Sequence, residues 1–470
     1  MSDWLNALWV IGLALPLWPL LARDRIKGLC YALFLCIAMP RYLRIETLGG
    51  LPEITIQRAL LLVLLAFWLK ERVRQGTSAG MPCRKNFLMY ILAGSISLLG
   101  AVDYGVAIKN FLDTVFEVAA YFLVVTTFVR RREDGLRLLR AAWLATCLVG
   151  MLAVFEHYTG FRALSRIFPA YALSGGYVND VVATFPHRIL LGTALAMGWP
   201  LAVAAVLSGQ GKDRRLSRLT IGILLAGCYF SMSRGPWLAA AGAGTILVWF
   251  GSKGLRKPLV WVGCLAVLVL LARPGVREGL LGRAQQTMDA DSAKGGTFMY
   301  RLELWKIAAH EILKSPWRTL FGYGPGAGSV MHFDWDLSYR DSGRDKSIHS
   351  WDNQYAYDLF QTGFAGLLAT FILYGGVAAG VLSRWRRAAQ PEKDLLACVL
   401  ASLAVMLFMR SNVLIYTSQL DYLFWSVAAA GFAVGGWYSE RATLAEQPAA
   451  VPELTGMKAD GLEGLGTQLR

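Results

Sequence analysis

Residues 349–353 read HSWDN and bring together side chains that could move a proton. A neutral imidazole at His349 or a carboxylate at Asp352 could act as a general base toward a hydroxyl group. The two residues stand three apart, so on a helix they would share one face. A structural role is equally available, because Ser350 or Asp352 before a helical run is an ordinary N-cap. Capping and catalysis are compatible interpretations of this segment.

Two arginines form a second group of candidates. Arg234 lies in the turn SMSRGPW (231–237) between two apolar runs, and Arg301 stands near the start of a later amphipathic stretch. The planar guanidinium fork matches the geometry of a phosphate group. However, most arginines at a membrane boundary contact lipid phosphate, and Arg301 taken singly would be a solvated charge. Position alone favours these structural roles.

A glycine-rich stretch, FGYGPGAGS (321–329), has Gly324 and Gly326 at its centre. It is not a typical phosphate-binding loop, because no strand precedes it and the Lys and Ser/Thr of a P-loop do not follow. We interpret it as a turn-rich loop that shapes a cleft.

The elements that must position these residues are apolar. The chain has 470 residues, is 55% hydrophobic and has a mean hydropathy of +0.44, with long apolar runs along its whole length. Soluble domains do not have this composition. We therefore expect an all-α polytopic membrane protein with about 12 transmembrane helices.

Basic residues set the expected orientation of these helices. The formal net charge is +15, but Lys and Arg fall in short clusters between apolar runs, such as RRR at 130–132, KDRR at 212–215 and RWRR at 384–387. This is the positive-inside pattern of cytoplasmic loops, so we expect no nucleic-acid partner. The seven cysteines lack metal-ligand and disulfide spacing, and no metal site is expected.

The alternation of apolar runs and basic clusters predicts the domain organisation. We expect a transmembrane domain over 1–440, a periplasmic loop inserted at 273–361, and a disordered cytoplasmic tail at 441–470. After the loop, the chain would re-enter the membrane at Gly363. Upstream of residue 70 the topology is open, since three runs either cross separately or include a re-entrant pair.

The outer loop contains an apolar-periodic stretch, YRLELWKIAAHEILKS (300–315), which predicts an amphipathic helix. Its expected apolar face consists of Leu302, Trp305, Ile307, Ala308 and Ile312. A long ordered loop between two spans is usually functional.

The order of these motifs resembles the O-antigen ligase and polymerase superfamily. Ser-Arg-Gly at Arg234 is followed by Arg-x-x-x-Trp at Arg301, by the glycine-rich loop, and by a polar pair before Gly-x-x-Gly at Gly363. The resemblance runs from about residue 184 to 380. It implies a glycosyltransferase of the bacterial inner membrane that needs no metal or cofactor. Such an enzyme moves a glycan en bloc from undecaprenyl pyrophosphate to an acceptor hydroxyl at the periplasmic face.

The resemblance also implies roles for particular side chains. Arg234 and, less directly, Arg301 would bind the pyrophosphate, and Arg188 in TFPHR is a further candidate for this role. The residues expected to shape the cleft are Gly324, Gly326, Asn353 and Gly363.

The identity of the base stays open between two residues. In the ligases, a His-led pair precedes Gly-x-x-Gly by nine residues. That spacing places Asp352 in the His position, whereas His349 and Ser350 leave twelve residues before Gly363. The Asp-Asn form is more similar to polymerases of O-antigen or exopolysaccharide.

Several functions follow from these alternatives. We favour a polymerase that joins lipid-linked repeat units with inversion at the anomeric carbon. A ligase would instead attach the finished glycan to the lipid A core. A transporter or flippase would need charged residues at mid-depth, and the apolar runs contain few of them. A membrane scaffold whose outer loop binds protein is a third class.

Overall fold

In the part of the chain that it describes, the computed structural model is about 81% helical. It describes residues 2–41, 43–45, 53–75, 80–162, 181–209, 211–272, 282, 293–333, 351–415 and 419–438. Within this described part, the strands are limited to one antiparallel pair, β1 (Arg44–Ile45) and β2 (Ile54–Thr55). The predominantly helical architecture expected from the apolar runs is therefore confirmed.

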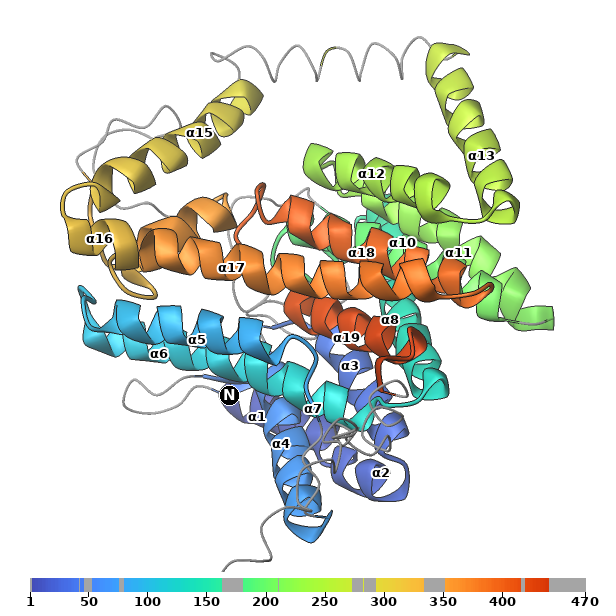
Figure 1. Cartoon of the computed structure of the whole chain (residues 1–470). Helices are drawn as coiled ribbons and strands as arrows, with labels where there is room; N and C mark the ends of the chain where they lie inside the picture. The colour runs from blue at the N-terminus through green and yellow to red at the C-terminus, as the bar shows by residue number, and fades with distance from the viewer. Residues whose placement is uncertain are drawn as a thin grey trace, which may run out of the picture.

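Helices form at each expected apolar run, because a helix satisfies its backbone hydrogen bonds internally, as a lipid environment requires. In chain order the helices are α1 (Ser2–Ala14), α2 (Leu17–Arg23), α3 (Arg25–Ala38), α4 (Ile56–Gln75), α5 (Arg84–Leu98), α6 (Tyr104–Thr114), the π-helical turn η2 (Val115–Ala120), α7 (Tyr121–Phe128), α8 (Arg132–Thr159), α10 (Arg188–Ser208), α11 (Gly211–Phe230), α12 (Arg234–Phe250), α13 (Lys253–Ala272), α15 (Ala293–Ile312), α16 (Pro316–Phe321), the 3₁₀ turn η4 (Ala327–Ser329), α17 (Gln354–Arg387), α18 (Glu392–Met409) and α19 (Gln419–Val434). Figure 1 shows their arrangement.

Five helical stretches of the described chain are long and apolar enough to cross a membrane. They are Trp4–Arg23, Tyr104–Phe128, Arg132–Thr159, Arg188–Ser208 and Gln354–Arg387. Two of the other apolar helices are shorter than the roughly 20 residues that a straight span needs; α12 has 17 residues and α19 has 16. The count of about 12 spans and the periplasmic position of the long loop stay predictions.

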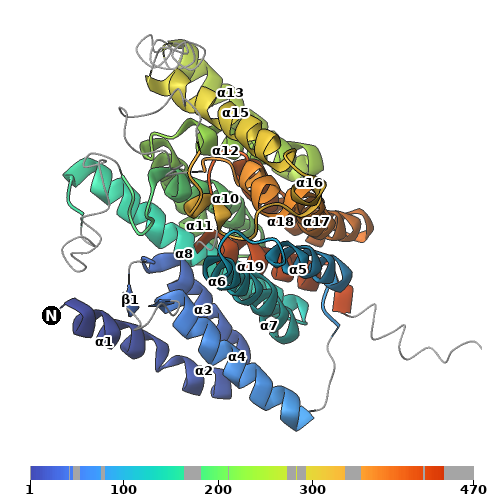
Figure 2. The same cartoon turned by 90° about the vertical axis from the view of Figure 1, so that its left-hand side faces the viewer.

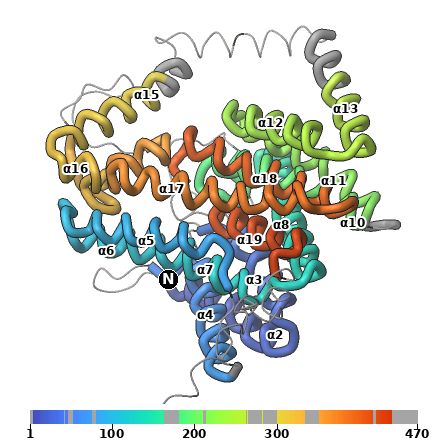
Figure 3. The backbone as a smooth tube through the Cα atoms, in the orientation of Figure 1, coloured from blue at the N-terminus to red at the C-terminus, as the bar shows by residue number. Residues whose placement is uncertain are grey.

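The hydrophobic core lies around α19, every residue of which is buried. Helices α8, α17 and α18 contact it directly, and Figure 3 shows α17 and α18 running side by side next to it. Both side views place α1, α2 and α4 at one end of the molecule and α12, α13 and α15 at the opposite end (Figure 2). Of the candidate residues, Arg234 lies at the start of α12, Arg301 on α15 and Gly363 in α17.

A second, smaller hydrophobic cluster joins α15 to the start of α17. Its members on α15 are Tyr300, Leu304, Ile307, Ala308 and Ile312. The predicted amphipathic helix is therefore present, but Leu302 is 42% exposed and does not belong to its buried face. The buried residues follow the helical spacing from Tyr300 onward, and Leu302 falls outside that stripe.

Helix α17 is broken at Gly363, where φ is 64° and ψ is −166°. The two halves fold back on each other, because the rings of Tyr355 and Phe371 stack with centroids 5.0 Å apart and the Asp358 side chain hydrogen-bonds to Thr370. In a straight helix these pairs would be separated by about 24 and 18 Å. The helix is thus a hairpin, with a short first arm ending at the turn and a long second arm.

Candidate active site

The first arm of the hairpin begins with the polar segment singled out in the sequence. Asn353 is its N-cap, and the Asn353 side-chain oxygen accepts a hydrogen bond from the backbone N–H of Ala356 at 3.1 Å. The cap expected at Ser350 or Asp352 therefore lies at Asn353 instead. His349 and Ser350 lie outside the described residues, so the choice between His349 and Asp352 as the base stays open.

Arg301 and Asp352 are brought together although 51 residues separate them. Arg301 Nη2 lies 3.6 Å from Asp352 Oδ2, and Arg301 Nε donates a hydrogen bond to the Asp352 backbone oxygen at 3.3 Å. Their side chains are 21% and 26% exposed, so solvent reaches both. Burial lowers the pKa of the Arg301 guanidinium, and the carboxylate of Asp352 opposes this shift.

The glycine-rich loop is attached to the turn of the hairpin. Backbone N–H groups of Tyr323 and Gly324 donate to the carbonyl oxygens of Phe360 and Gln361, at 3.1 and 2.9 Å. Gly326 N–H donates to the Gln361 side chain. The loop, predicted to shape a cleft, packs against the hairpin and holds its turn in place.

Glycine is required on both sides of this contact. Gly322, Gly324 and Gly326 all have positive φ, at 68°, 97° and 81°. At Gly363 a Cβ atom would collide with the backbone carbonyl of Leu320, which no rotamer change could relieve. Non-glycine residues also pay a conformational cost at positive φ. The spacing of these glycines therefore has a steric cause.

A pocket enclosing about 560 Å³, partly open to solvent, lies beside the hairpin between α5, α6 and α17. Pro325 of the glycine-rich loop forms part of its wall, and Tyr90, Thr114, Asp358 and Thr362 contribute polar groups. The lining of this pocket is thus mostly apolar, with a few polar groups next to the hairpin.

Sequence reasoning missed a buried ion pair behind the hairpin. Arg410, just after α18, donates through Nη2 to Asp358 Oδ2 and through Nη1 to the Tyr374 hydroxyl, both at 3.0 Å. Gln354 donates to the other Asp358 oxygen at 2.8 Å. The Arg410 and Asp358 side chains are only 5% and 11% exposed. The cluster ties the two arms of α17 to the end of α18.

Arg188 and Arg234 are the first residues of α10 and α12, respectively. These two helix starts pack together, because a Cβ at Gly192, one turn beyond Arg188, would lie 2.7 Å from the Ser231 hydroxyl and 2.8 Å from Pro236. Helix N-termini present backbone N–H groups and a partial positive charge. Two arginines at adjacent helix starts make this region suited to an anion.

The start of α12 and the start of α17 border the same short segment, residues 409–412. A Cβ at Gly235 would lie 3.2 Å from Met409 and 3.7 Å from Asn412. On the other side, the backbone N–H of Gln354 donates to the Arg410 carbonyl at 2.8 Å. The backbone next to Arg234 and the backbone next to Asp352 therefore lie at one end of α18.

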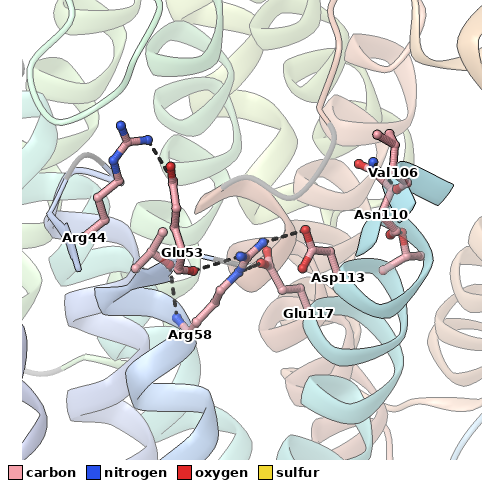
Figure 4. A network of polar contacts seen from close by, with 9 residues as sticks. Arg44, Glu53, Arg58, Val106, Asn110, Asp113 and Glu117 are labelled. Atoms are coloured by element: carbon pink, nitrogen blue, oxygen red, sulfur yellow. Dashed lines mark hydrogen bonds and ion pairs between the residues drawn. The ribbon is translucent and has the colours of Figure 1, made fainter. Parts of the chain in front are cut away.

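A further charged network lies between α4 and α6 (Figure 4). Arg58 on α4 contacts Asp113 on α6 at 2.7 Å and Glu117 on η2 at 2.8 Å, and the Glu117 side chain is 3% exposed. The expectation that the apolar runs carry few charged groups is wrong here. Because one guanidinium bridges both carboxylates, the network joins α4 to α6 and η2. This arrangement favours a structural role over an ion pathway.

The comparisons with known proteins identify one family. The family model described as O-antigen ligase matches residues 219–371, about a third of the chain. No curated protein matches the chain. The match includes Arg234, Arg301, the glycine-rich loop, Asp352 and Gly363, whereas Arg188 lies outside it. The resemblance predicted from the order of the motifs is confirmed over this region.

Proposed function

Since residues 219–371 carry the O-antigen ligase domain, we propose that the protein transfers a glycan en bloc from undecaprenyl pyrophosphate to a sugar hydroxyl at the periplasmic face of the inner membrane. The observation that supports this proposal most directly is the contact between Arg301 and Asp352 at the start of the hairpin. This contact places a proton acceptor beside a guanidinium. The start of α12, which carries Arg234, borders the same end of α18 as the start of α17.

The proposed reaction is a direct displacement. The acceptor hydroxyl oxygen attacks the anomeric carbon of the donor while Asp352 takes its proton, unless His349 has this role. The bond from the anomeric carbon to the phosphate oxygen breaks, and the pyrophosphate leaves with the electron pair. Arg234 and Arg188, together with the N-terminal N–H groups of α12 and α10, stabilise the charge on the leaving group. A single displacement inverts the anomeric centre.

Arg301 has two roles in this scheme. Its Nε bond to the Asp352 backbone and its Nη2 contact with the carboxylate fix where the base lies. The remaining N–H groups of the guanidinium can reach toward a phosphate oxygen, because the fork carries five donors. Arg301 would thereby hold the base and the leaving group at a defined separation.

The Asp-Asn pair at 352–353 favours a polymerase that extends O-antigen or exopolysaccharide repeat units over a ligase that uses the lipid A core. The two activities consume different donors. A deletion strain would accumulate lipid-linked single repeat units if the protein is a polymerase, and finished lipid-linked chains if it is a ligase. If neither lipid accumulates, the transferase proposal is wrong and a scaffold or transporter is favoured.

A further inference from the structure

A second pocket lies at the junction of α3, α4, α7 and α8, apart from the hairpin and the glycine-rich loop. It encloses about 790 Å³, part of it open to solvent. Four arginines line it, namely Arg25, Arg72, Arg130 and Arg131. The basic clusters at 23–27 and 130–132 contribute three of them, so the pocket faces the side of the membrane that the charge pattern assigns to the cytoplasm.

The charges in this pocket do not cancel. Glu71 pairs with Arg25, and Asp134 accepts a hydrogen bond from the Arg131 backbone at 3.1 Å as part of the α8 cap. Arg130 uses Nε to donate to the Thr127 carbonyl at 3.0 Å, which leaves its two terminal amino groups for another acceptor. Two carboxylates face four guanidinium groups, so the pocket carries a net positive charge of two.

Arg72 is held toward the pocket by an aromatic ring. Its guanidinium lies 5.1 Å from the ring centroid of Trp68, one turn earlier on α4. Among the residues that the structure describes, Arg72 and Arg130 have no carboxylate partner within 4 Å. Stacking on a ring orients a guanidinium while leaving its N–H groups available to a phosphate.

Helix α4, which contributes Trp68 and Arg72 to the pocket, also carries an exposed apolar stripe. Leu62, Leu69 and Val73 on α4 are 52%, 53% and 85% exposed, and their spacing of seven and four residues places them on one helix face. Trp18 is 39% exposed, with the Lys70 ammonium 5.2 Å from its ring centroid. Tryptophan beside a basic residue is typical of the headgroup level of a bilayer.

We propose that this pocket binds the phosphate of an anionic phospholipid of the cytoplasmic leaflet. The guanidinium groups of Arg72 and Arg130 contact the phosphate, and the acyl chains lie along the exposed stripe of α4. Basic pockets between membrane helices on this side bind such headgroups by the same chemistry. The lipid then bridges the end of α4 to the α7–α8 junction and stabilises the N-terminal helices against the core.

The test measures thermal unfolding of the full-length protein in detergent with added lipid. Cardiolipin or phosphatidylglycerol should raise the unfolding temperature, whereas phosphatidylcholine and inorganic pyrophosphate should not. Arg72→Gln/Arg130→Gln should lose most of the shift. The matched control, Lys253→Gln/Lys257→Gln, removes the same charge from an exposed basic cluster on α13 and should keep the shift.

Three results would overturn the proposal. An unchanged shift in the pocket variant would show that the arginines do not bind the lipid. An equal loss in the α13 control would show that general surface charge is responsible. A comparable shift with pyrophosphate would assign the pocket to a free anion. If the double variant does not fold, Thr127→Phe fills the pocket without removing a charge, and it should abolish the lipid shift; if it leaves the shift intact, the proposal is wrong.

Discussion

Arg410 and Asp358 form a nearly solvent-free ion pair at 3.0 Å that connects the end of α18 to the first arm of the α17 hairpin. Tyr374 on the second arm accepts a hydrogen bond from the same guanidinium. One side chain therefore contacts both arms, a few residues from Asp352. The pair is placed to hold the hairpin closed and the candidate base at a fixed depth.

Removing one partner of this pair should destabilise the fold. Arg410→Met leaves the Asp358 carboxylate buried without its counter-ion, and such changes cost about 3–5 kcal/mol. The double variant Arg410→Met/Asp358→Leu removes both charges and should recover most of the loss. Unfolding of the purified protein in detergent measures both effects. A double variant as unstable as Arg410→Met would show that the ion pair is not the source of the stability.

Asp352→Asn should lower the initial rate of glycan transfer by roughly 10²- to 10⁴-fold, because the side chain keeps its shape but no longer accepts the proton. His349→Gln should have a much smaller effect if Asp352 is the base. Lys306→Ala, an exposed change on α15 near Arg301, serves as the control. The reverse order of the two effects would transfer the role of base to His349.

Arg234→Ala should abolish transfer without lowering the amount of protein in the membrane or the level of lipid-linked donor. The physical reason is that the leaving pyrophosphate loses a fixed guanidinium, a kind of interaction that contributes about 2.7–4 kcal/mol in comparable sites. Arg234→Lys should recover part of the rate, since it restores the charge but not the fork. Full activity of the alanine variant would remove Arg234 from the proposed mechanism.

Gly363→Ala should impair folding, whereas Gly375→Ala on the second arm of α17 should not. The methyl group of an alanine at residue 363 would collide with the Leu320 carbonyl, and the alanine backbone would have to keep a positive φ. A Cβ at Gly375, in contrast, has no atom within 4 Å. The yield of folded protein after detergent extraction compares the two variants. Equal yields would contradict the steric role assigned to the turn.

Arg58→Gln should destabilise the attachment of α4 by about 3–5 kcal/mol, because the buried Glu117 carboxylate and the partly buried Asp113 carboxylate lose their shared cation. Adding Asp113→Asn and Glu117→Gln should restore much of the stability. Limited proteolysis between α4 and α5, together with thermal unfolding, reports the change. If transfer activity falls while the unfolding temperature stays constant, the network has a role beyond the structural one.

The sequence was sufficient to predict the mostly helical fold and the order of the motifs. It also singled out Arg301 and Asp352, which the structure brings into contact, although their roles stay predictions. It did not reveal the hairpin, because it predicted only that the chain re-enters the membrane at Gly363. The reversal comes from the backbone angles at this glycine, which no residue pattern indicates. The pairing of Asp358 with Arg410 was missed because 52 residues separate them. A usable signal existed, since a lone carboxylate and a lone arginine at apolar helix ends each require a partner.

The reversal of α17 determines where Asp352 lies and how water and an acceptor alcohol can reach it. The first arm runs from Asn353 to the turn, so Asp352 lies about 16 Å of helical rise away from Gly363, on the side of Tyr374 and Arg410. The Asp352 side chain is 26% exposed, so an entering alcohol can reach the carboxylate from solvent. Water can use the same opening, so hydrolysis of the activated sugar would be limited by how completely the bound acceptor fills it.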